Sequence, residues 1–170
     1  MIGWGMTRRA LFAAATLAAV AAAAVPAAWA QQFQQFFPLL VDLQGWKGNK
    51  PDGVAMQIPG SSMLTATREY ERGEARVNAQ VISGPAAEGA LTAINPGMKV
   101  ETSDARMSTA TIDGMTVTRT YTIADKSGVV LVVLGPKAMF SFTFSGIGDD
   151  EALTLARRFD WKAIQGALPK

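Results

Sequence analysis

The stretch from Arg106 to Phe144 decides the fold, and it reads RMSTATIDGMTVTRTYTIADKSGVVLVVLGPKAMFSFTF. Asp113-Gly114 has the residue types of a two-residue hairpin turn, and two further turn-like clusters follow at 125–128 and 135–137. The segments between these turns are rich in β-branched and aromatic residues, which favour strands. We expect strands at Arg106–Ile112, Met115–Ile123, Val129–Leu134 and Phe140–Phe144. Strands joined by tight turns pair antiparallel, so this stretch predicts a meander.

Toward the N-terminus the sequence predicts one more hairpin. Met63–Glu71 and the alternating segment Ala75–Val81 flank the turn Arg72-Gly73, and a short strand is expected at Val54–Ile58. Apolar spacing predicts an amphipathic helix over Gln31–Phe37 and a helix from Pro85 to Ile94. A last helix is expected from an N-cap at Asp149 to about Gln165. We therefore predict an α+β fold: a mostly antiparallel sheet of about six strands, two main helices packed on it and a short N-terminal helix.

The first thirty residues have the three parts of a signal peptide. Arg8-Arg9 is a basic start, Ala10–Val25 is an apolar run, and Ala28-Trp29-Ala30 is a small-residue cleavage box. The run is shorter than the roughly 20 residues that span a bilayer. We expect cleavage between Ala30 and Gln31, so that residues 31–170 form a single exported domain. The pair of arginines also fits a twin-arginine signal, but Ala13 replaces the usual lysine, and we favour the general secretory route.

Composition excludes several classes of function. The chain has no cysteine and no histidine, so it cannot form disulfides, thiolate nucleophiles, imidazole bases, Cys/His zinc sites or histidine-ligated haem. Removal of Arg8 and Arg9 from the 16 basic residues leaves 14, which equals the 14 acidic residues. A neutral domain does not favour nucleic acid as a partner. No phosphate-binding glycine motif is present. We predict no cofactor and no metal site. We also expect the cleaved domain to be periplasmic and to have no stable membrane anchor.

Two chemical alternatives remain at the level of sequence. Glu69, Glu71 and Glu74 surround the first hairpin, and a carboxylate-based hydrolase could use two of them if one were desolvated. Thioethers bind Cu(I) in exported proteins, and the domain has six methionines, although none has M-x-M or M-x-x-M spacing. These six residues are Met56, Met63, Met98, Met107, Met115 and Met139. Cross-strand ion pairs explain the glutamates, and core packing explains most of the methionines.

Four aromatic residues near the start of the domain are the candidate interaction surface. Phe33, Phe36 and Phe37 share the first expected helix, and Trp46 lies between glycine and lysine in the following loop. If the helix docks on the sheet, these side chains belong to the core. If it does not dock, they form an exposed apolar patch of the kind that marks a binding surface.

Several short phrases of the chain also occur together in a known group of proteins. They are Gly45-Trp46-Lys47, the segment Arg68–Gly73, Ile112-Asp113-Gly114, Thr120-Tyr121, Asp149–Leu153 and Phe159-Asp160-Trp161. With these residues the chain resembles a family of small uncharacterised exported proteins of Gram-negative bacteria. The order of its elements is also similar to that of PsbP-like domains, which are antiparallel sheets with helices on their faces. Neither resemblance implies catalytic residues. We expect an accessory domain that binds an envelope protein or a small apolar ligand and is not an enzyme.

Overall fold

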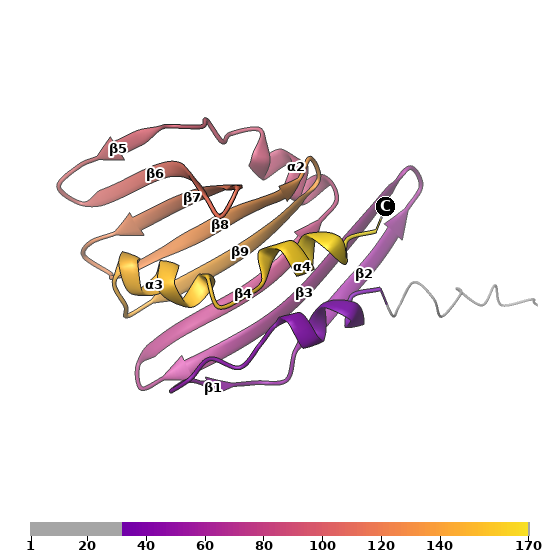
Figure 1. The fold of residues 1–170 in the computed structure, drawn as a ribbon, viewed down its shortest axis with the longest axis horizontal. Coiled ribbons are helices and arrows are strands. Elements are labelled where there is room, and N and C mark those ends of the chain that lie inside the picture. Colours follow the sequence, from indigo (N-terminus) through magenta and orange to yellow (C-terminus); the bar gives the residue numbers. More distant parts are fainter. Residues whose placement is uncertain (1–31, 170) are drawn as a thin grey trace, which may run out of the picture.

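A computed structural model describes residues 32–169, which form one nine-stranded sheet with four short helices (Figure 1). The predicted signal peptide and its predicted cleavage point, Ala30 and Gln31, lie outside the described residues. The strands are β1 (Lys47–Gly48), β2 (Asp52–Ile58), β3 (Ser61–Arg72), β4 (Ala75–Ser83), β5 (Lys99–Glu101), β6 (Ala105–Ile112), β7 (Met115–Thr122), β8 (Ser127–Gly135) and β9 (Ala138–Ser145). The helices are the 3₁₀ helix η1 (Gln34–Leu39), α2 (Pro85–Leu91), α3 (Asp149–Ala156) and α4 (Trp161–Gly166).

Every strand pair in the sheet is antiparallel. The spatial order is β1-β3-β4-β9-β8-β7-β6-β5, and β2 pairs with β3 beyond the end of β1. The meander from β6 to β9 agrees with the turns predicted from sequence. At its first turn both Asp113 (φ 52°) and Gly114 (φ 82°) have positive φ, as a type I′ hairpin turn requires. The last strand, β9, lies between β4 and β8 and joins the two halves of the sheet.

The predicted sheet of about six strands with two main helices is wrong. The sheet has nine strands, and the helices are only six to eight residues long. The strands β1 and β5 were missed because two and three residues are too few to show alternation. The last predicted helix is interrupted at 157–160, and Asp149 is its first residue rather than its N-cap, which is Gly148.

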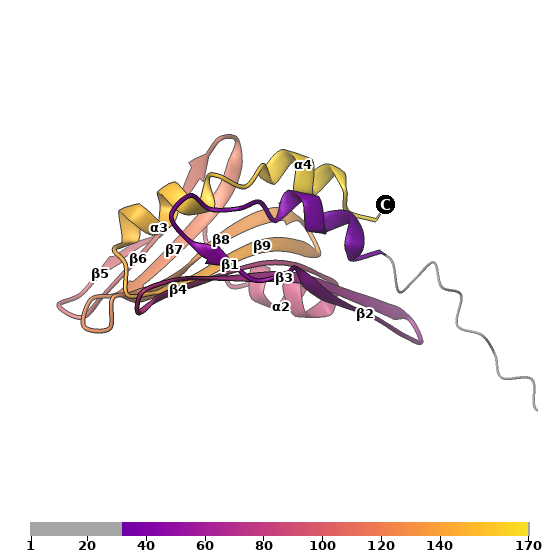
Figure 2. The same cartoon turned by 90° about the horizontal axis from the view of Figure 1, so that it is seen from below.

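The core lies between the sheet and a layer made of η1, α3 and α4. These three helices cover one face of the sheet, and α2 lies on the opposite face (Figure 2). Strand alternation turns Val77, Val130, Val132, Phe140 and Phe142 toward the helical layer, where they are buried. We call this side the core face and the opposite side the outer face.

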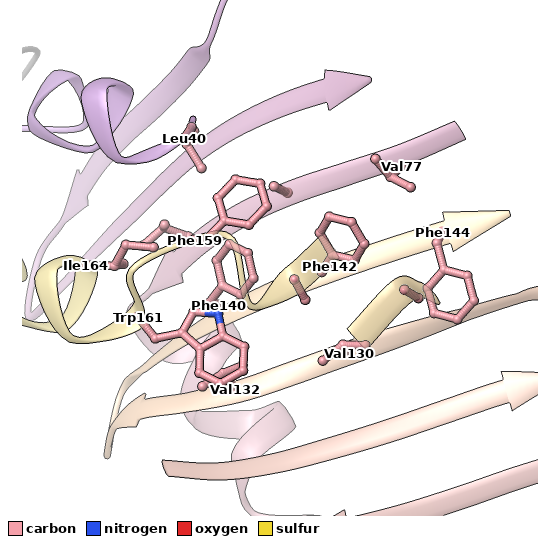
Figure 3. Packing of buried hydrophobic residues seen from close by; sticks show 14 of the residues in the cluster. Leu40, Val77, Val130, Val132, Phe140, Phe142, Phe144, Phe159, Trp161 and Ile164 are labelled. Carbon is pink, nitrogen blue, oxygen red and sulfur yellow. The ribbon is translucent and has the colours of Figure 1, made fainter. Parts of the chain in front are cut away.

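Phe159 connects the helical layer to the sheet. It lies in the interruption between α3 and α4, and its ring centroid is 5.1 Å from that of Phe140 and 5.9 Å from that of Phe142. Tyr70 of β3 meets Phe159 edge-on at 6.3 Å. Trp161 is buried in the same cluster of side chains (Figure 3). Because the helix is interrupted, both Phe159 and Trp161 reach the core. A continuous helix would orient these two side chains differently.

The strand run Val129–Leu134 is central in the sheet, as predicted, but its two faces differ. Val130, Val132 and Leu134 are buried on the core face, whereas Val129 and Leu131 are half-buried on the outer face. The helix α2 and the chain that follows it cover only part of the outer face, so that the remainder is accessible (Figure 2). Among the described residues no helix has the length and apolarity needed to cross a membrane.

Candidate functional site

The strand β2 carries the main group of exposed apolar side chains. Val54, Met56 and Ile58 are 55%, 51% and 53% exposed, and the register with β3 places all three on the outer face. Large apolar residues in the rest of the described chain are buried or half-buried, except for Val100 at 47%. We call Val54, Met56 and Ile58 the β2 stripe.

The backbone of β2 adds a second feature to this surface. β2 pairs with β3 on one side, and no described strand pairs with its other side. An unpaired strand edge presents peptide N–H and C=O groups that another chain can use for hydrogen bonds. The β2 stripe and this open edge are therefore adjacent parts of one surface.

The end of β2 projects from the body of the sheet. Pairing between β3 and β4 begins at Leu64 and Ser83, so Ser61, Ser62 and Met63 pair only with β2. Figure 2 shows the β2–β3 hairpin extending past α2 at this end of the molecule. Met63 lies opposite Met56 and widens the apolar surface from β2 onto β3. A projecting hairpin is reached easily by another chain.

The two edges of the sheet are protected differently. Monomeric proteins usually protect sheet edges with short strands, charged residues, prolines or bulges. At one edge β5 has three residues, two of which are Lys99 and Glu101, and Glu101 forms an ion pair with Arg106 at 3.0 Å. At the other edge the fifteen-residue run 53–67 contains no charged residue at all. Apart from Asp52 at its start, β2 thus lacks the charges that would discourage strand pairing.

The predicted aromatic surface is mostly part of the core. Phe36 and Trp46 are buried, and Phe33 and Phe37 are half-buried with ring centroids 5.6 Å apart. The helix η1 docks on the core face because the ring of Phe33 lies against Gly53, where any Cβ would approach it to 2.5 Å. The indole of Trp46 is covered by the guanidinium of Arg72, 4.3 Å from the ring centroid. These four residues therefore do not form an exposed patch.

Two polar side chains of β3 hold the connector after η1 on the sheet. The Tyr70 hydroxyl donates to the carbonyl oxygen of Val41 at 2.7 Å, and burial raises the pKa of this phenol above its ordinary value. Arg68 donates to the carbonyl oxygens of Leu40 (2.7 Å) and Asn49 (2.9 Å) and forms an ion pair with Asp42. The contacts satisfy the polar atoms of the connector and have a structural role.

The three candidate catalytic glutamates are all exposed. Glu69 accepts a long hydrogen bond from Asn78 (3.4 Å), Glu71 forms an ion pair with Arg76, and Glu74 lies in the turn. Glu69 and Glu71 line a shallow hollow of about 300 Å³ on the outer face, but a desolvated carboxylate is not present there. General acid catalysis at neutral pH needs such a desolvated acid. The three glutamates therefore have the exposed positions expected of residues that form cross-strand ion pairs, and not those expected of a catalytic site.

The methionines do not converge. Met115 and Met139 are buried, and Met56 and Met63 are neighbours across the β2–β3 hairpin. Met107 lies on β6, three strands from β9, and Met98 precedes β5. Two adjacent thioethers supply fewer soft ligands than a Cu(I) site of three or more sulfur atoms. The described residues contain no group of three acidic side chains placed to hold a metal ion.

A half-buried arginine is engaged in an ion-pair network. Arg119 of β7 points toward the core face and donates to Asp149 and, at 2.8 Å, to Asp150 at the start of α3. Burial opposes the charge of Arg119, but these hydrogen bonds outweigh it, so the pKa of the guanidinium is raised above its ordinary value. The network attaches α3 to the sheet.

The hollow beside the start of α4 does not suit a small apolar ligand. A hollow of about 430 Å³ lies between α4 and the β6–β7 turn, and charged side chains form much of its wall. Arg157 crosses it with two hydrogen bonds of 3.1 Å to Asp113. Sites for small apolar molecules are lined predominantly by hydrophobic side chains. The β2 surface is the better candidate for binding.

Comparison with family models, curated proteins and solved structures gives no match for this chain.

Sequence reasoning overlooked the β2 stripe although its signal was present. The segment Val54–Ile58 was expected only as a short strand, and no face of it was assigned to the core or to the surface. Alternation shows which side chains share a face but not whether another element covers that face. The absence of charge from 53 to 67 was the additional signal.

Proposed function

We propose that residues 31–170 are an exported periplasmic accessory domain without catalytic activity, which binds a polypeptide strand along β2. The observation that carries this proposal is the β2 stripe beside an open, uncharged strand edge. Strand addition uses both features, because backbone groups supply affinity and alternate side chains supply specificity.

The proposed location and the lack of catalysis have separate support. The basic start, apolar run and cleavage box at residues 8–30 support export, as does the resemblance to exported proteins of Gram-negative bacteria. The absence of histidine and cysteine and the exposure of Glu69, Glu71 and Glu74 support a binding role over hydrolysis.

Position-specific photo-cross-linking in living cells tests the proposal. The full sequence is expressed with a photoreactive residue at one position of β2 at a time, and envelope protein is analysed. We expect cross-links from positions 54, 56 and 58. Position 100 is similarly apolar and exposed but lies on β5, at the other edge of the sheet; this control should give none.

The same material tests export, since N-terminal sequencing of the recovered protein should begin at Gln31. Cross-linking of equal strength at positions 54 and 100 would contradict a β2 binding surface. Recovery of an intact Met1 from the membrane fraction would contradict processing.

A further inference from the structure

We propose that the strand bound by β2 is the β2 strand of a second copy of this chain, paired antiparallel about a twofold axis. This inference rests on the proposed function and names its partner. The result would be one continuous sheet through two molecules, with the β2 stripes of both copies joined on the outer face.

The pattern of β2 is complementary to itself. When two antiparallel strands pair with Met56 opposite its own copy, Val54 lies opposite Ile58 of the second copy. Every pair on the outer face is then apolar, and directly opposite Cβ atoms lie about 4.5–5.5 Å apart. On the core face Ala55 lies opposite Gln57 of the second copy, and neither is charged.

The absence of charged residues near Met56 favours pairing of two copies about a twofold axis. Near such an axis each residue lies close to its own copy, so a single charge there would meet a charge of the same sign. The charged residue of β2 nearest to Met56 is Asp52, four positions from the axis. The domain without residues 1–30 is also neutral, with 14 basic and 14 acidic residues. Electrostatic repulsion between copies is therefore small.

The size of the edge sets the expected affinity. In this register residues 54–58 of the two copies face each other; five residues of strand are about 17 Å long, and an edge about 10 Å thick covers about 170 Å² per copy. Stable dimers bury about 800 Å² per partner. The dimer should therefore exchange with the monomer and depend on concentration.

Sedimentation equilibrium with charge variants is the first test. Protein expressed from the full sequence and processed by the cell should show a monomer–dimer equilibrium. Met56→Lys places two like charges at the axis and should raise the dissociation constant at least tenfold. Val100→Lys, on β5 at the other edge of the sheet, should change the dissociation constant by no more than about twofold. All three proteins should melt at the same temperature, because both substituted side chains are about half-exposed.

Cysteine cross-linking is the second test and does not depend on a charge. The chain has no cysteine, so Met56→Cys introduces a single thiol. Under mild oxidation it should form a covalent dimer rapidly, since the two thiols meet at the axis, whereas Val100→Cys should remain monomeric.

The outcomes separate this inference from the proposed function. A monomer at every concentration, or equal behaviour of the variants at positions 56 and 100, would overturn the second copy as partner. If photo-cross-links at positions 54, 56 and 58 then remain but have a mass other than twice that of the chain, strand binding survives with a different partner. If those cross-links are also lost, both proposals fail.

Discussion

At the scale of single residues, Arg119 shows what sequence can place and what it cannot. Arg119 lies on the core face of β7, opposite Val130 of β8, and Asp149 was correctly put at the start of a helix. The local interpretation of Asp149 as an N-cap was wrong, because its carboxylate bonds to Arg119 and not to the helix backbone. A contact between residues 30 positions apart has no local signal, so the pairing could not be predicted.

Removing the guanidinium tests the importance of this network. Arg119→Ala leaves Asp149, whose side chain is 21% exposed, without its ionic partner. We expect a loss of about 1–3 kcal/mol in the free energy of unfolding, measured by urea denaturation, because an unpaired and partly buried charge is costly.

Arg106→Ala is the matched control for this variant. Its ion pair with Glu101 is exposed on both sides, at 56% and 69%, and such pairs contribute about 0–1 kcal/mol. Equal losses in the two variants would show that the Arg119 network contributes no more to the free energy of unfolding than an exposed ion pair does.

At the scale of elements, long alternating strands were predictable and short or interrupted elements were not. The hairpins around Gly73 and Gly114 follow from turn residues and period-two patterns, and the structure contains both. The interruption between α3 and α4 left no such pattern, because residues 149–165 are compatible with one continuous helix. What breaks the helix is the burial of Phe159 and Trp161 against the sheet together with a new cap at Asp160.

The cap of α4 gives a prediction at this scale. The Asp160 carboxylate accepts a hydrogen bond from the backbone N–H of Ala163 at 2.9 Å. Asp160→Ala should lower the free energy of unfolding by about 1 kcal/mol, as the loss of other N-caps does. Asp125→Ala is a suitable control, since Asp125 is exposed and has no side-chain bond among residues 32–169. A loss no larger than that of the control would mean that packing alone holds α4.

At the scale of the whole molecule, one aromatic side chain holds the two layers together. Phe159 is 2% exposed and touches rings from β3 and β9. Phe159→Ala should cost about 3–5 kcal/mol in urea denaturation, because it removes a large buried side chain and leaves a cavity. Phe33→Ala removes a ring of equal size that is only half-buried, so its cost should be clearly smaller. The reverse order would show that the helical layer is attached mainly through η1.

The antiparallel character of the sheet was predictable, but its extent and strand order were not. Tight turns join the adjacent strands of the meander from β6 to β9, so few alternative strand pairings were possible there. The pairing of β9 with β4 depends instead on a long connection through α2 and β5, and no local pattern encodes it. The exposed edge at β2 was hidden for the same reason, since only the assembled sheet shows which strand is left without a neighbour.

The position of β9 also determines when the two halves of the sheet can join as the chain is synthesised. The β1–β4 half of the sheet is connected to the β5–β8 half through hydrogen bonds of Ala138–Ser145 on both sides. A growing chain that has not reached Ala138 lacks every one of these bonds, and β4 and β8 remain as separate open edges. Contacts between strands so distant in sequence raise the contact order, and such topologies fold slowly compared with locally connected ones. The strand that unites the two halves is therefore the last of the nine to be synthesised, and the halves cannot join before it.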